Sequence, residues 1–158
     1  MDMWKAFRNS TKKHAPDAKV LFDKFHIIKH LSDAMDQVRR EEYRRVSGKK
    51  ERSFIKGQQY TLLAHQENLT LEGCESLKKL LAANKRIQTA YLLKEEFAQM
   101  WDYRSEAWAR KFFDNWKQQL KWQRLKPFER FSAKNTNSFF ARIRLFLTHS
   151  NLHRPTIM

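Results

Sequence analysis

A long amphipathic helix is the feature that most constrains what this chain can fold into. Between Phe25 and Val46, apolar side chains recur at spacings of three and four residues, with charged side chains between them. The apolar set is Ile27, Ile28, Leu31, Met35 and Val38. Near its end, Glu41 and Arg45 stand four residues apart, where an ion pair would support the helix. With 3 glycines and 3 prolines in 158 residues, the chain has too few turn residues for an all-β protein. The predicted fold is therefore mainly α.

A short apolar run before this helix predicts one β-strand. Val20–Phe22 follows a turn signal at residues 15–17 and is too short for a helix, which favours a strand buried on both faces. Asp23 ends the strand, and the helix that starts near Phe25 carries His26. In open α/β folds, ligands gather where strands end in this way. Upstream, residues 3–14 predict a short amphipathic helix.

Several further helices are predicted after Gly57. Thr70 is expected to cap one of them, with Glu72 in its first turn, and Asn84 to interrupt it. Ser105 is expected to cap the last long helix, which Pro127 closes. Beyond residue 132 the periodicity is lost.

Aromatic residues at spacings of four mark the last long helix. The set is Trp108, Phe112, Trp116 and Leu120. Such a stripe could stack nucleobases, but aromatic residues on one helical face more often form core, and we interpret these as core.

The charge of the chain predicts a nucleic-acid partner. There are 32 lysines and arginines against 17 acidic residues, a net charge of +15 and a sequence pI near 10.1. Neutralising phosphates releases counterions, so such a surplus favours nucleic-acid binding. The candidate DNA-binding residues are Arg39, Arg40, Arg44, Arg45, Lys49 and Lys50. The last two stand in an expected turn, and a solvated loop is as good an interpretation of that cluster as a phosphate contact.

Few motifs point to other chemistry. Asp23, His26 and His30 have the spacing of a metal site, but no third nitrogen or sulfur ligand is clearly placed, which favours His30 as a packed or surface residue. No Ser-His-Asp elbow, glycine-rich phosphate loop or CxxC pair occurs. Cys74 stands alone, as expected for a reducing, cytoplasmic compartment. No apolar run is long enough to span a membrane, and no signal peptide opens the chain.

Several blocks of this sequence resemble, in order and spacing, the DDE transposases of bacterial insertion sequences, specifically the ISL-three family. The first blocks are Asp2-Met3-Trp4-x-x-Phe7, Ala15-Pro16-x-Ala18, Phe22–Lys29 and Arg39-Arg40-Glu41. The later blocks, similar to the helical insertion of that family, are Gln59-Tyr60-x-Leu62-Leu63, Glu67–Thr70, Leu92–Glu95 and Trp116. The resemblance runs from Asp2 to about Phe131.

The resemblance implies an RNase H-like α/β core, here represented by one strand, followed by an all-helical insertion. Such enzymes hold two divalent metals, normally Mg²⁺, with three carboxylates and use them for phosphoryl transfer. Asp2 matches the second carboxylate, and so would be catalytic and a metal ligand. Asp23 and His26 match an Asp-x-x-His motif beside the active site. The implied divisions are a partial core over 1–46, the insertion over 47–131 and a divergent tail over 132–158.

The other two carboxylates have no match. Glu72 sits in an Asn-x-x-x-Glu-Gly pattern like that around the third carboxylate, but inside the region that resembles the insertion. We therefore expect a truncated, bacterial, nucleoid-associated transposase that is inactive alone and binds no Mg²⁺. Its expected partners are transposon-end DNA and a full-length transposase. The alternatives are a non-catalytic DNA-binding remnant that modulates such a transposase, and a product that folds poorly because its strand lacks neighbours.

Overall fold

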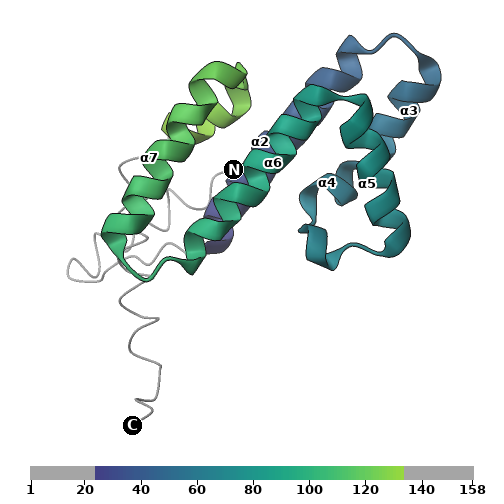
Figure 1. The fold of residues 1–158 in the computed structure, drawn as a ribbon. Helices are drawn as coiled ribbons and strands as arrows, with labels where there is room; N and C mark the ends of the chain where they lie inside the picture. The colour runs from purple at the N-terminus through teal and green to yellow at the C-terminus, as the bar shows by residue number, and fades with distance from the viewer. Residues whose placement is uncertain (1–23, 134–158) are drawn as a thin grey trace, which may run out of the picture.

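Two long helices run side by side through the middle of the molecule. The computed structural model describes residues 24–133, and that range contains no β-strand (Figure 1). α2 (Lys24–Arg45) packs along α6 (Lys85–Ala98). The predicted helix from Phe25 to Val46 is thus confirmed, and so is the mainly α class. The predicted strand and the helix over 3–14 lie outside the described residues.

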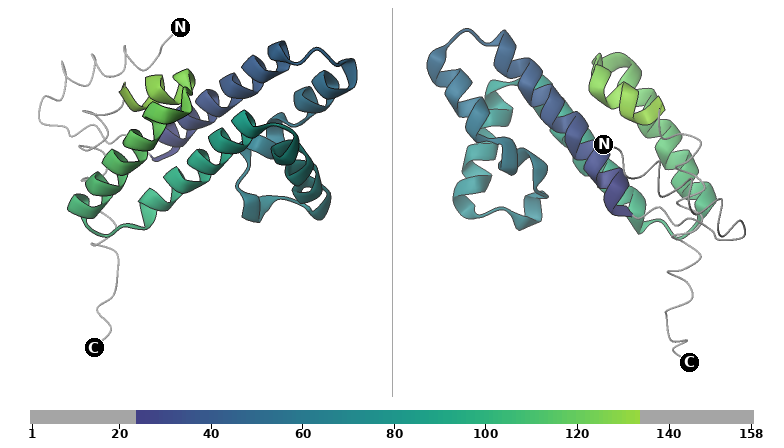
Figure 2. Two further views of the ribbon diagram at one scale, coloured as in Figure 1. Left: turned by 45° about the horizontal axis from the view of Figure 1, so that its top comes forward. Right: turned by 180° about the vertical axis from the view of Figure 1, so that it is seen from behind.

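Three shorter helices lie on one side of this pair. They are α3 (Lys49–Gly57), α4 (Gln59–Leu63) and α5 (Leu71–Ala83), with a 3-10 turn, η1 (Gln66–Asn68), between the last two (Figure 2). The predicted break before α5 and its cap are confirmed, because the Thr70 hydroxyl accepts a hydrogen bond from the backbone N–H of Gly73 at 3.2 Å.

The last long helix lies on the other side of the pair. The chain leaves α6 through η2 (Gln99–Asp102) and continues into α7 (Glu106–Gln123) (Figure 2). Ser105 does occupy the N-cap position, although its side chain makes no capping hydrogen bond. α7 ends at Arg124, which adopts a left-handed conformation with φ 51°. The sequence predicted that Pro127 closes α7, and this prediction is wrong. Pro127 lies in the first turn of a further helix over 126–133, where a missing N–H is tolerated.

Asn84 joins three helices at one point. Its backbone ends α5, and its side-chain oxygen caps α6 by accepting from the N–H of Ile87 at 2.9 Å. Its side-chain nitrogen also donates to Glu42 of α2 at 3.1 Å. The predicted interruption at Asn84 is therefore a cap that also fixes α2 against α6.

An aromatic cluster fills the space between α6, α7 and the helix over 126–133. Trp116 is fully buried, its ring centroid lies 4.9 Å from that of Phe97, and its Nε1 donates to the Leu93 carbonyl at 2.9 Å. Phe113, Phe128 and Phe131 complete the cluster. The buried stripe of α7 is Ala109, Phe113, Trp116 and Leu120.

The predicted core stripe of α7 is thus only half right. Trp116 and Leu120 are buried, but Trp108 is 61 % exposed and Phe112 is only partly buried. A spacing of exactly four drifts around a helix of 3.6 residues per turn, so residues 108 and 112 leave the face that residue 116 buries.

A lysine is buried among the helices on the opposite side. The ammonium of Lys94 donates to the carbonyls of Leu62, Leu63 and Ala64 at the end of α4, at 2.9, 3.4 and 2.6 Å. It also pairs with Glu95 at 2.9 Å. Burial lowers the pKa of Lys94, and the contact with Glu95 partly opposes this shift. Lys94 therefore supplies the donor that the last carbonyls of α4 lack within their own helix.

Tyr91 lies beside this lysine, one turn earlier in α6. The ammonium of Lys94 sits 4.6 Å from the centre of its ring, and its hydroxyl is buried with no hydrogen-bond partner in the described part of the chain. Burial, followed by the charge of Glu95 and that of Cys74, raises the pKa of Tyr91 to about 12.

Candidate nucleic-acid interface

The predicted catalytic residues fall at or beyond the edge of the described chain. Asp2 and Asp23 lie outside the described residues. The backbone of His26 lies in the first turn of α2, and its side chain is not among those described. His30 is exposed one turn later and lines a hollow of about 220 Å³ with Arg130 of the helix over 126–133. Within residues 24–133, no group of three histidine, cysteine or acidic side chains is placed to hold a metal ion.

Arginines neutralise three of the four acidic side chains of α2, all except the exposed Asp33. Asp36 is buried and accepts from Arg39 at 2.7 and 2.8 Å and from Arg40 at 2.7 Å. Arg39, predicted to bind DNA, is itself buried and directed to this carboxylate rather than to solvent. Arg40 keeps 63 % of its side chain exposed, so its outer face remains accessible.

Glu41 and Glu42 are held from α6. Arg86 places Nη2 2.8 Å from Glu41 and Nε 3.2 Å from Glu42. Arg45 also pairs with Glu42, at 3.0 Å, and its side chain remains 59 % exposed. The predicted pair between Glu41 and Arg45 is therefore wrong. Glu41 pairs instead with Arg86, which is distant in sequence, and Arg45 pairs with Glu42.

Positive charge remains exposed where α2 passes into α3. Arg44, Lys49 and Lys50 are exposed, and within residues 24–133 none of their side chains makes an ion pair or a hydrogen bond. The sequence predicted a turn at the two lysines, but they form the start of α3. They add charge to the positive end of a helix dipole, with Glu51 the acidic residue of that turn. We call Arg44, Arg45, Lys49 and Lys50 the α2–α3 basic surface.

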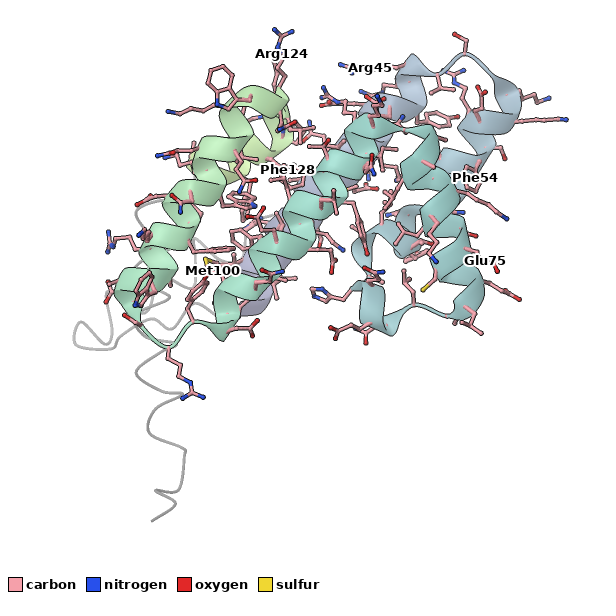
Figure 3. The ribbon with its side chains drawn as sticks, in the orientation of Figure 1. Arg45, Phe54, Glu75, Met100, Arg124 and Phe128 are labelled. Carbon is pink, nitrogen blue, oxygen red and sulfur yellow. The ribbon has the colours of Figure 1, made fainter. Side chains whose placement is uncertain are left out.

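Arg52 fixes α3 against the end of α2. Its Nε donates to the carbonyl of Tyr43 at 3.1 Å, and its guanidinium lies 5.2 Å from the centre of the Tyr43 ring. Figure 3 shows Arg45 at the end of α2, and Phe54 on α3 beyond it. The α2–α3 basic surface is thus carried by two helices in a defined arrangement and not by a solvated loop. Such a surface can contact phosphates.

The comparison with known proteins decides the family. A family model for DDE transposases of the ISL3 type, described as a transposase, matches residues 1–152. The chain belongs to this ISL-three transposase family. The match passes Phe131, where the sequence resemblance was placed to end, and takes in most of the tail.

One curated relative supports the same assignment. The ISL-three chain is 31% identical over 121 residues to the transposase for insertion sequence element IS1001 of Bordetella parapertussis. The alignment covers 75% of this chain and 30% of that transposase, so the chain spans less than a third of its relative's length. No solved structure matches the ISL-three chain.

The structure also adds to what the sequence indicated. Among the described helices, none has both the length and the apolar composition of a membrane span. Lys94 was not predicted as a buried residue, although it lies three residues from both Tyr91 and Phe97, on the face of the helix that those aromatic residues occupy. The exposed Trp108 was assigned to the core. The more regular apolar spacing of residues 109, 113, 116 and 120 is the signal that separates the two faces of α7.

Proposed function

We propose that this chain binds the DNA of an insertion element through phosphate contacts of the α2–α3 basic surface, and that it does not by itself carry out strand transfer. The observation that supports binding is the exposed positive charge of Arg44, Lys49 and Lys50, which no acidic side chain of the described residues neutralises. Membership of a transposase family makes DNA the natural polyanion.

The engagement of three of the four acids of α2 by arginines supports the absence of catalysis. Two Mg²⁺ ions need carboxylates that are open to them. Asp36, Glu41 and Glu42 are each engaged by arginines and so are poor ligands for a cation. The family resemblance leaves Asp2 as the candidate catalytic carboxylate and Asp23 and His26 as the motif adjacent to the active site. Because one carboxylate cannot hold two metal ions, a catalytic role for the chain would depend on a full-length transposase. We propose that the chain competes or assembles with such a transposase on the ends of the element.

Salt dependence of DNA binding tests the proposed contacts. The affinity of the 158-residue protein for a labelled duplex is measured by fluorescence anisotropy over a range of salt concentrations. Each phosphate contact contributes about 0.9 to the slope of log affinity against log salt. The double variant Lys49→Gln/Lys50→Gln is expected to lower that slope by about 2 and to weaken binding.

A matched control removes the same charge elsewhere. Lys78 and Lys79 are adjacent, exposed lysines on α5. Lys78→Gln/Lys79→Gln changes the net charge equally and is expected to leave the slope close to that of the unchanged protein. Equal effects of the two double variants would show that net charge, and not the α2–α3 basic surface, determines binding.

A cleavage assay tests the second part of the proposal. The protein is incubated with a labelled duplex and Mg²⁺, and no strand cleavage or transfer is expected. Cleavage that Asp2→Ala abolishes would contradict the proposal and make Asp2 part of a working metal site. Addition of an intact transposase of the same family then tests whether the chain lowers or raises its activity.

A further inference from the structure

The outward face of α7 carries two exposed tryptophans. Trp108 is 61 % exposed and Trp122 is 86 % exposed, although both belong to a helix whose opposite face is fully buried. Lys111, Asn115 and Gln118 are also exposed. At 100° per residue, these five side chains share one stripe of α7. We call it the tryptophan stripe.

The composition of the tryptophan stripe does not suit an apolar partner. Between its two indoles stand a lysine and two amides, whereas a helix that packs on another protein helix carries apolar residues at these positions. The ammonium of Lys111 lies 5.4 Å from the centre of the Trp108 ring. Exposed aromatic rings, amides and cations on one face are the groups that stack on bases, bond to base edges and neutralise phosphates.

Charge supports a polyanionic ligand. Residues 106–126 contain six basic side chains and two acidic ones. One of the acids, Glu106, is paired with Arg110 at 3.2 Å. The positive charge reaches the end of the helix, where Figure 3 shows Arg124 at the same end of the molecule as Arg45.

The size of the tryptophan stripe argues against a second copy of the chain as its occupant. The two exposed indoles supply on the order of 300–400 Å² of surface, whereas a stable dimer buries about 800 Å² on each partner. The net positive charge of α7 would also make two copies repel each other.

We infer that the tryptophan stripe binds unpaired nucleotides by stacking of bases on Trp108 and Trp122. A duplex hides the faces of its bases, so indole stacking selects a single strand or an unpaired end. The two tryptophans stand 14 residues apart, about 21 Å along the helix. That distance corresponds to roughly six nucleotides at the 3.4 Å spacing of one strand in a duplex. This site is on a different helix from the α2–α3 basic surface and goes beyond the proposed function.

Substitution of the two tryptophans tests this inference. The affinities of the 158-residue protein for labelled oligothymidylate and for a labelled duplex are compared by anisotropy. Stacking on one aromatic side chain contributes about 1–3 kcal/mol, so Trp108→Ala and Trp122→Ala are each expected to weaken single-strand binding about 5- to 150-fold. Duplex binding is expected to change less than about twofold, and Trp122→Phe is expected to restore most of the single-strand affinity.

Tyr60→Ala is the matched control. Tyr60 is an aromatic residue of α4, 81 % exposed and away from α7, and its removal is expected to change neither affinity. Circular dichroism checks that each variant keeps its helices. The inference is overturned if the tryptophan variants bind oligothymidylate as the unchanged protein does, or if they lose affinity for single strand and duplex equally. It is also overturned if they abolish a dimer without affecting single-strand binding.

The design separates this inference from the proposed function. Loss of single-strand binding in the tryptophan variants with no measurable duplex binding would support the stripe and contradict the proposed phosphate contacts. Duplex binding that depends on Lys49 and Lys50, with no effect of the tryptophan substitutions on single-strand binding, would support the proposed phosphate contacts and contradict the tryptophan stripe.

Discussion

Replacement of Lys94 by methionine is the sharpest test of how the described helices are held together. Methionine keeps most of the length and apolar volume of the lysine but removes its three donors. The carbonyls of Leu62 and Ala64 lose hydrogen bonds of 2.9 and 2.6 Å to a charged group. Each such bond contributes about 1.5–3 kcal/mol.

Removal of the buried charge offsets part of this loss of stability. Burial lowers the pKa of Lys94, which shows that its charged form is held at a desolvation cost that methionine does not have. We therefore expect Lys94→Met to lower the free energy of unfolding by about 3 kcal/mol. For a domain of this size the corresponding fall in Tm is about 10 °C.

Urea unfolding followed by far-ultraviolet circular dichroism measures the effect, with Lys85→Met as the control. Lys85 is an exposed lysine in the first turn of the same helix, and its replacement is expected to change stability by less than about 0.5 kcal/mol. If Lys94→Met proves as stable as Lys85→Met, the carbonyls at the end of α4 do not depend on the ammonium and the reasoning is refuted.

The pH dependence provides a second readout of the same residue. Because the pKa of Lys94 is lowered in the folded state from its usual 10.5, the unfolded chain binds more protons in the pH range between these two values. Lys94 therefore makes the free energy of unfolding rise as the pH increases through that range. Lys94→Met is expected to lose this rise, whereas Lys85→Met keeps it.

Two further substitutions test the packing around α6. The pKa of Tyr91 is raised from 10.0 to about 12 in the folded state. Its contribution to the free energy of unfolding is therefore complete below pH 10 and falls by about 2–3 kcal/mol as the pH rises to 12. Tyr91→Phe is expected to reduce that fall in unfolding curves measured at alkaline pH, and an unchanged fall would exclude Tyr91 as its source. Asn84→Ala removes both the cap of α6 and the donor to Glu42, and is expected to lower stability by about 1–2 kcal/mol in urea; a loss of only a few tenths would mean that water replaces both bonds.

Local rules account for the parts of the fold that the sequence predicted well. The apolar spacing of residues 27, 31, 35 and 38 predicts α2 and the face it buries, since a helix places those positions on one side whatever it packs against. Thr70 and Asn84 mark helix boundaries for an equally local reason, because each side chain bonds to a backbone N–H three residues on. The basic surplus of the chain, and with it the expectation of a nucleic-acid partner, likewise needs only the composition.

Contacts between distant segments decided the rest. Nothing near Glu41 in the sequence indicates that Arg86 will be its partner, because that pair forms only when α6 packs along α2. Arg39 and Asp36 pair within α2, but other segments of the fold are needed to bury both side chains, and that burial removes Arg39 from the DNA-binding set.

In α7, too, the sequence determined the helix and contacts with other helices determined which face is buried. Its sequence alone fixed an aromatic helix with basic flanks, since propensity and periodicity are properties of the segment. Only the aromatic cluster with Phe97 and Phe128 decided that Trp116 lies inside and Trp108 outside, because a side chain is buried by the surface it meets and that surface comes from other helices.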